Sequence, residues 1–139
     1  MLVLTRKKNT SVLIGPHVVL IVRSIRAEEV LIHVLCPPDL PVRTTGFRPS
    51  DARPVPRLAI AAPSMVREAG GTWSLAPAEV RIDQALRIGE DITVTIEGLH
   101  FSDGLPTRVR LGIVAPRDVQ IIRDELLARQ PGPAEAPQA

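Results

Sequence analysis

The residues of this chain that could do chemistry are mostly basic side chains. Arg6, Lys7 and Lys8 form a cationic triplet near the amino terminus. A guanidinium group is planar and has five N–H donors, so an arginine can hold a phosphate, or O6 and N7 of a guanine, through two parallel hydrogen bonds. A basic triplet is also typical of a solvated face, and the triplet alone does not separate these two interpretations.

Other reactive side chains do not form a recognisable site. His17, His33 and His100 together with Cys36 lack the spacing of metal ligands, so no metal and no cofactor is expected. No nucleophile pattern is present either, and the chain is not expected to be an enzyme. A single cysteine cannot form a disulfide within the chain, and no signal peptide is visible, which together predict a cytoplasmic protein.

A β-rich segment occurs twice in the chain. Its strands must position the side chains of any functional site. Residues 11–42 read SVLIGPHVVLIVRSIRAEEVLIHVLCPPDLPV, and residues 85–121 read ALRIGEDITVTIEGLHFSDGLPTRVRLGIVAPRDVQI. Aligning the Ile-Gly pairs gives an offset of 74, from position 14 to position 88, and aligning later valines gives 79, from position 30 to position 109. The second copy therefore carries extra residues between these points. One copy of roughly 45 residues is too small for a core of its own, so the copies should share one.

Short strands are predicted in both copies by β-branched residues and alternating polarity. The predicted strands are Leu2–Arg6, Ser11–Ile14, Val18–Ile25, Val30–Leu35 and Leu40–Arg43 in the first copy, and Glu79–Ile82, Ala85–Ile88, Ile92–Glu97, Thr107–Val114 and Asp118–Ile121 in the second. Leucine spacing and a stop at Pro131 predict a helix over Arg123–Gln130.

These elements give four segments. Residues 1–43 form repeat one, residues 44–78 a Pro-rich linker, residues 79–130 repeat two with its helix, and residues 131–139 a disordered tail. The prolines of the linker exclude a continuous helix, and its apolar patch Leu58–Ala62 is expected to pack against the barrel.

Both ends of the chain carry motifs of one family. The chain begins MLVLTRKK, each copy has a short Ile-Gly turn, and the second copy ends TRVRLGIVAPRDVQIIRDEL. These motifs, in this order, resemble the carbon storage regulator (CsrA/RsmA) family of bacterial RNA-binding translational regulators. Members fold as interleaved homodimers. The resemblance therefore implies a mainly β, pseudo-dimeric barrel or sandwich, in which two interleaved five-strand repeats and a short C-terminal helix belong to one monomeric chain.

The family builds its RNA surface where the first strand of one subunit meets the last strand of its partner, so a fused chain has two such seams. Seam A joins Leu2–Arg6 to the strand near Val119–Ile121, and these two strands are expected to pair. Seam B has Ala78, Glu79 and Val80 in place of Leu-Thr-Arg, and Thr44 in place of Arg123, so it is expected to have lost RNA binding. The RNA-binding residues expected at seam A are Leu4, Thr5, Arg6, Lys7, Ala115, Pro116, Val119, Ile121 and Arg123.

The resemblance implies a post-transcriptional regulator that binds GGA-type motifs in single-stranded or hairpin-loop regions of mRNA leaders. Arg6 and Arg123 would hold phosphates or guanines, Thr5 would add a hydroxyl, and Leu4 would offer an apolar surface to a base. Small regulatory RNAs and a protein antagonist are further candidate partners, and no membrane is expected. The alternative is an RNA-inactive interaction module of the same fold, such as a partner of a flagellar assembly factor.

Few aromatic residues are available for stacking bases. The chain has no tyrosine, and its three aromatic residues lie in the linker or the hairpin insertion, which argues against RNA-binding modules that stack bases on a sheet. The insertion, Leu99–Pro106, places Leu and Phe near a hairpin tip, where they could serve local packing or contact a partner.

Overall fold

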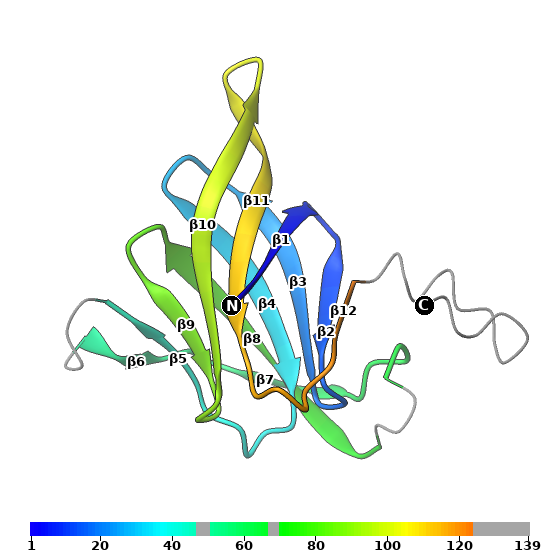
Figure 1. Ribbon diagram of the computed structural model, residues 1–139. Coiled ribbons are helices and arrows are strands. Elements are labelled where there is room, and N and C mark those ends of the chain that lie inside the picture. The colour runs from blue at the N-terminus through cyan, green and yellow to red at the C-terminus, as the bar shows by residue number, and fades with distance from the viewer. Residues whose placement is uncertain (47–50, 67–69, 124–139) are drawn as a thin grey trace, which may run out of the picture.

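Two six-stranded antiparallel sheets form the protein. The computed structural model describes residues 1–46, 51–66 and 70–123 (Figure 1). Its strands are β1 (Leu2–Lys7), β2 (Ser11–Ile14), β3 (Val18–Ile25), β4 (Glu29–Cys36), β5 (Val42–Thr45), β6 (Arg53–Pro54), β7 (Leu58–Ala61), β8 (Thr72–Arg81), β9 (Ala85–Ile88), β10 (Ile92–Ser102), β11 (Leu105–Val114) and β12 (Ile121–Arg123). The first sheet has the order β1-β11-β10-β9-β5-β6 and the second β12-β2-β3-β4-β8-β7. The predicted mainly β fold is confirmed.

Each sheet contains strands from both copies, as the interleaved fold requires. In the first sheet, β1 of the first copy pairs with β11 of the second, with Leu4 opposite Leu111. In the second sheet, β12 pairs with β2, with Ile121 opposite Ile14. The prediction that Leu2–Arg6 pairs with the strand near Val119–Ile121 is wrong. The two strands lie at the edges of different sheets, and each uses its inner side to pair with a strand of the other copy.

The pairing register follows the two sequence offsets. The pair Leu4 and Leu111 corresponds to the pair Ala78 and Ile32, because position 78 follows position 4 by 74 and position 111 follows position 32 by 79. The irregularity between Val22 and Ser24 recurs 74 residues later, between positions 96 and 98. The copies therefore share one fold, and they are related by a pseudo-twofold arrangement of their strands.

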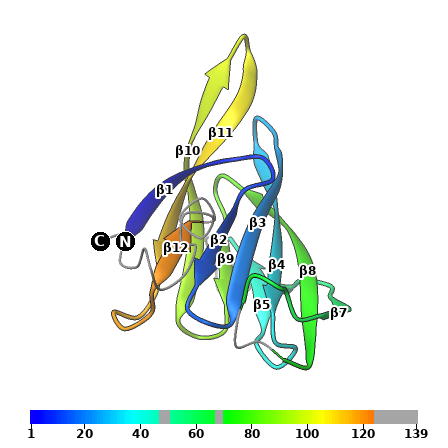
Figure 2. The ribbon, with the colours of Figure 1, turned by 90° about the vertical axis from the view of Figure 1, so that its right-hand side faces the viewer.

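The extra residues of the second copy lengthen one hairpin. Strand β10 continues to Ser102 and β11 begins at Leu105, so both strands run further than predicted. The turn residues Asp103 and Gly104 both have positive φ, at 52° and 79°, which suits the tight turns that follow the twist of a hairpin. In both ribbon views this hairpin projects beyond the other strands (Figures 1 and 2).

Several predicted strand limits need correction. Strand β5 spans Val42–Thr45, two residues later than expected, and β12 spans Ile121–Arg123, three residues later. Strand β8 begins at Thr72, seven residues before the predicted start at Glu79. Arg123, placed at the start of the predicted helix, belongs to β12. The rest of that helix and the predicted tail lie outside the described residues.

The segment expected to be a linker carries strands of its own. Its prolines exclude a helix but are compatible with edge strands, which need donors on one side only. Strand β6 pairs with β5, and β7 pairs with the beginning of β8. In the patch Leu58–Ala62, Ile60 and Ala62 pack against a cluster that contains Trp73, whereas Leu58 is exposed. The patch therefore packs against the sheet through one of its sides.

One hydrophobic core fills the space between the sheets. It combines buried residues of both copies, including Val12, Ile32, Leu86, Val109 and Leu111. Neighbouring residues of the same strands face away from this core, and on the second sheet they form a separate cluster under the linker. Because both copies contribute to the same core, neither can be stable without the other.

This shared core predicts a single cooperative unfolding transition. Leu111→Ala in the second copy and Ile32→Ala at the equivalent position of the first should each lower the free energy of unfolding by about 2–5 kcal/mol, because each leaves a cavity. Urea denaturation followed by circular dichroism measures both effects. Two separate transitions in either variant would contradict a shared core.

Candidate nucleic-acid interface

The strands of seam A, β1 and β12, are edge strands on the same side of the two sheets. Residues 8–10 lead the chain directly from β1 to β2, and β2 is the neighbour of β12. Asn9 makes this tight turn with a φ of 66°, which asparagine tolerates better than most residues, and its amide donates to the carbonyl of Val22 at 2.6 Å. The Thr10 hydroxyl donates to the carbonyl of Lys7 at 2.7 Å. The turn thereby holds the two edges together.

Alternation along β1 separates its side chains into two sets. Thr5 and Lys7 point outward and are exposed, whereas Leu4 and Arg6 point into the sandwich, with exposed fractions of 4% and 3%. Leu4 belongs to the core, so its side chain is not the exposed apolar surface that was expected for a base. Arg6 is buried where the equivalent strand has Val80. The exposed apolar side chains of this strand are instead Leu2 and Val3.

The residues expected from the second copy form the turn into β12 and the strand itself. The amide of Val119 donates to the carbonyl of Pro116 at 3.0 Å, and the amide of Gly15 donates to the carbonyl of Gln120 at 2.7 Å. Ala115, Val119 and Ile121 are half-buried and pack against the core. Arg123 is half-buried in β12, opposite Val12. The structure therefore brings the predicted residues to one side of the sandwich, with their side chains in unequal environments.

A basic row crosses the outer face of the first sheet beside seam A. Lys7 on β1 lies opposite Arg108 on β11, and Arg108 lies opposite His100 on β10. Arg110 follows on the same face of β11, opposite Thr5. Sequence reasoning missed both arginines of β11. The signal was present, because they alternate with apolar residues that the structure buries.

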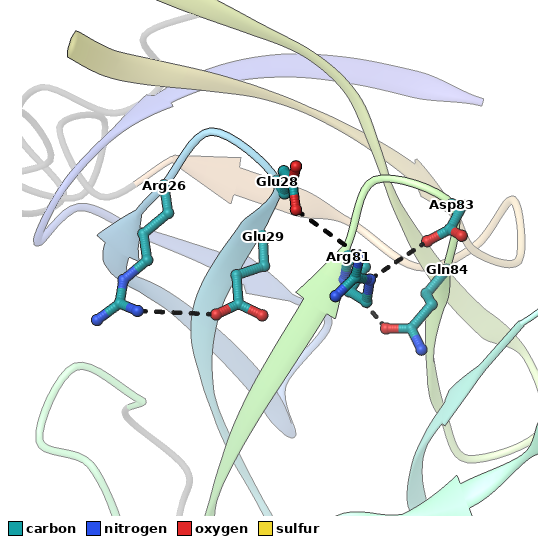
Figure 3. A network of polar contacts seen from close by, with 6 residues as sticks. All are labelled: Arg26, Glu28, Glu29, Arg81, Asp83 and Gln84. Atoms are coloured by element: carbon teal, nitrogen blue, oxygen red, sulfur yellow. Dashed lines mark hydrogen bonds and ion pairs between the residues drawn. The ribbon is translucent and has the colours of Figure 1, made fainter.

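The equivalent face of the second sheet is neutralised by ion pairs (Figure 3). The position of Lys7 opposite Arg108 corresponds to that of Arg81 opposite Glu29. The ion pairs on this face are Arg26–Glu29 at 3.9 Å, Arg81–Glu28 at 3.8 Å and Arg81–Asp83 at 3.9 Å. These exposed pairs contribute little to stability. They do neutralise the arginines of this face, whereas the corresponding face of the first sheet keeps its positive charge.

At seam B the linker covers the outer edge of β5, which is the strand that corresponds to β12. Strand β6 lies beside β5, and the amide of Val55 donates to the carbonyl of Val42 at 2.9 Å. Arg57 donates to the carbonyl of Leu40. Val42 and Leu40 correspond to Ile121 and Val119 of seam A under the offset of 79. The main-chain acceptors that could read a base at seam B therefore already have partners within the chain.

Arg57 stabilises the position of the linker at seam B through hydrogen bonds to neighbouring segments. Its guanidinium donates to the Ser74 hydroxyl, with Nη2 at 2.6 Å, and to the carbonyl of Pro37 at 3.0 Å. Nη2 also lies 3.1 Å from Sγ of Cys36. Burial raises the pKa of the Cys36 thiol, although the Arg57 charge acts in the opposite direction. Cys36 is fully buried, as expected for a small apolar residue at the position of Ala115.

Among residues 1–46, 51–66 and 70–123, no three His, Cys, Asp or Glu side chains are grouped in a way that could hold a metal ion. The same residues contain no helix of the length and apolarity needed to cross a membrane.

The fold and the seam define a class of protein. It is a pseudo-dimer of two strand-exchanging copies, with basic side chains beside an edge that no other described strand covers. Comparison with protein families identifies the class further. Residues 1–44 and 79–130 match the CsrA global regulator protein family, and the chain belongs to this family.

A similar protein is the translational regulator CsrA of Hydrogenovibrio crunogenus (strain DSM 25203 / XCL-2). It is 47% identical over 49 residues, which cover 35% of this chain and 63% of that protein. The chain thus spans somewhat less than two thirds of the length of this relative. No solved structure matches the chain.

The contacts of Arg57 predict that this side chain keeps the linker on the outer edge of β5 at seam B. Arg57→Ala should lower the free energy of unfolding by about 1–3 kcal/mol, because it leaves carbonyl groups and the Ser74 hydroxyl without their donor. It should also speed the exchange of the Val55 amide, which hydrogen-exchange NMR measures. Arg53→Ala, an exposed arginine of β6, is the matched control and should change neither quantity. Unchanged protection of Val55 in Arg57→Ala would show that the closure does not depend on this side chain.

Proposed function

We propose that the protein is a post-transcriptional regulator that binds one GGA-type RNA element per chain, at seam A, as a monomeric pseudo-dimer. The observation that carries the proposal is the difference between the seams. In the described sheets, β1 and β12 each have a neighbour on one side only, whereas β6 covers the equivalent edge at β5. Membership of a family of global regulators supports the regulatory part of the proposal.

The chemistry of seam A suits an unpaired RNA loop. Edge strands present N–H and C=O groups in a row, and around Val119–Ile121 these could pair with the edges of splayed bases. Lys7 and Arg123 would supply cationic contacts to phosphate or guanine, and Thr5 would supply a hydroxyl. Leu4 and Arg6 would act from inside the sandwich by fixing the position of β1.

A single site has a consequence for regulation. A symmetric dimer with two sites can bind two motifs of one RNA, and the second contact then benefits from a high effective concentration. A chain with one site gains no such avidity, so it would bind single motifs independently. The protein would therefore act on transcripts with one accessible motif and would not bridge two motifs.

A second candidate function is an RNA-inactive interaction module of the same fold. The burial of Leu4 and Arg6 favours this candidate, because two side chains expected to touch RNA are held inside the protein. RNA binding by the unaltered protein would exclude it, and the absence of binding to any GGA hairpin would support it.

Matched substitutions at the two seams test the proposal. Arg123→Ala should weaken binding to a GGA hairpin by about 1–3 kcal/mol, because it removes a charge-assisted contact. Thr44→Ala, at the equivalent position of seam B, should leave the affinity unchanged. Fluorescence anisotropy measures both affinities, and a titration at high protein concentration gives the stoichiometry. Two RNA molecules per chain, or equal effects of both substitutions, would refute a single site at seam A.

The salt dependence of binding tests the electrostatic part separately. If basic side chains at seam A neutralise about three phosphates, log affinity should fall with log salt with a slope of about −2, at roughly 0.7 per phosphate for single strands. Anisotropy titrations at several salt concentrations give this slope. A slope near zero would mean that the basic residues form only a solvated face.

A further inference from the structure

We propose that the extended β10–β11 hairpin forms a second nucleotide subsite, which binds unpaired nucleotides that flank the motif held at seam A. The proposal rests on the proposed function of seam A and extends its RNA footprint. It assigns a role to the residues that the second copy has gained over the first.

A cleft lies where the hairpin meets the end of β1. It has a volume of about 430 Å³, and its lining residues are Lys7, His100, Phe101, Ser102, Thr107 and Arg108. This volume falls within the range of about 300–1,000 Å³ that is typical of small-ligand clefts. Lys7 lines the cleft and also belongs to seam A, so an RNA strand that leaves seam A along β1 would enter the cleft next.

The cationic residues of the cleft lack the compensation found elsewhere in the protein. Lys7 lies directly opposite Arg108, and like charges in this arrangement destabilise a sheet. Among the described residues, neither of these two makes an ion pair with an acidic side chain. The equivalent pair in the second sheet is Arg81 and Glu29, whose charges are opposite. A phosphate group between Lys7 and Arg108 would remove their repulsion.

An aromatic ring completes the subsite. The side chain of Phe101 is 54% exposed although it lies within a strand, where an aromatic residue usually gains stability from burial. The pairing register shifts between His100 and Phe101 and leaves Thr107 of β11 as the extra residue. Such a bulge can turn consecutive side chains toward the same face, which explains how Thr107 and Arg108 both line the cleft. Stacking on an aromatic ring accepts any base, so the subsite would bind flanking nucleotides with little sequence preference.

The first copy provides an internal comparison. Its shorter hairpin also has a cleft, and the lining residues there are Arg26, Ala27, Glu28, Glu29 and Arg81. Acidic groups occupy this cleft and pair with its arginines, so a phosphate would be repelled. Of these two clefts in the described part of the chain, only the one at the β10–β11 hairpin combines cations that lack an acidic partner with an exposed ring.

Two RNAs test the subsite by fluorescence anisotropy, a GGA hairpin with a blunt stem and the same hairpin with a short unpaired extension on either side. The unaltered protein should bind one extended RNA about tenfold more tightly than the blunt hairpin, as expected for one stacked base and one phosphate contact. Phe101→Ala and Arg108→Ala should each remove most of this gain and leave the affinity for the blunt hairpin unchanged. Phe101→Trp should retain the gain, and Arg81→Ala, in the equivalent cleft, should alter neither affinity.

The outcomes separate this inference from the proposed function. If the blunt hairpin binds but extensions add nothing, the subsite is refuted, seam A stands, and the exposed Phe101 would be available to a protein partner. If the blunt hairpin does not bind, the proposed function of seam A fails. The cleft is then tested alone by NMR titration with an unpaired RNA that lacks GGA. Shifts centred on the amides of Phe101, Ser102 and Thr107 would support the subsite, and their absence would refute it.

Discussion

The exchange of edge strands between the two copies is the constraint on which the structure depends. Strand β1 completes the sheet of the second copy through β11, and β8 completes the sheet of the first copy through β4. Without these exchanged strands each copy would expose the apolar faces that now form the common core. The exchange also creates two seams, because each copy sends a first strand and a last strand to its counterpart.

Fusion into one chain lets these two seams change independently. In a homodimer a substitution alters both seams at once, whereas in this protein each seam has its own residues. Arg6 and Val80 occupy equivalent buried positions, and the basic pair of the first sheet corresponds to the oppositely charged pair Arg81 and Glu29 of the second. Among the described strands, β1 and β12 have no neighbour on their outer sides and positive charge lies nearby, whereas the equivalent edges of the other side are covered by β6 and β7 and the charges there are paired.

The connection between the copies contributes to this difference. The chain must pass from β5 to β8, and along this path it adds β6 to one sheet and β7 to the other. Unpaired strand edges invite association with other chains, so covering them protects the protein as well as closing seam B. Arg57 fixes the path by bonding to groups of both neighbouring segments, including Ser74 and the carbonyl of Pro37. A segment that links the copies thus also determines which seam stays open.

The sequence by itself determined the repeat, the mainly β fold and the offsets that the pairing register obeys, because alternation and chain spacing are local properties. It also located most strands of the copies, although not the limits of β5, β8 and β12. The sequence led to the expectation that Leu4 and Arg6 contact RNA, and it could not show that the face of β1 on which both lie is the buried one. Only the tertiary structure decided that β1 pairs with β11, that the linker covers seam B, and that Lys7, Arg108 and His100 form one row. These features depend on contacts between residues distant in the chain, which alternation within a single strand cannot specify.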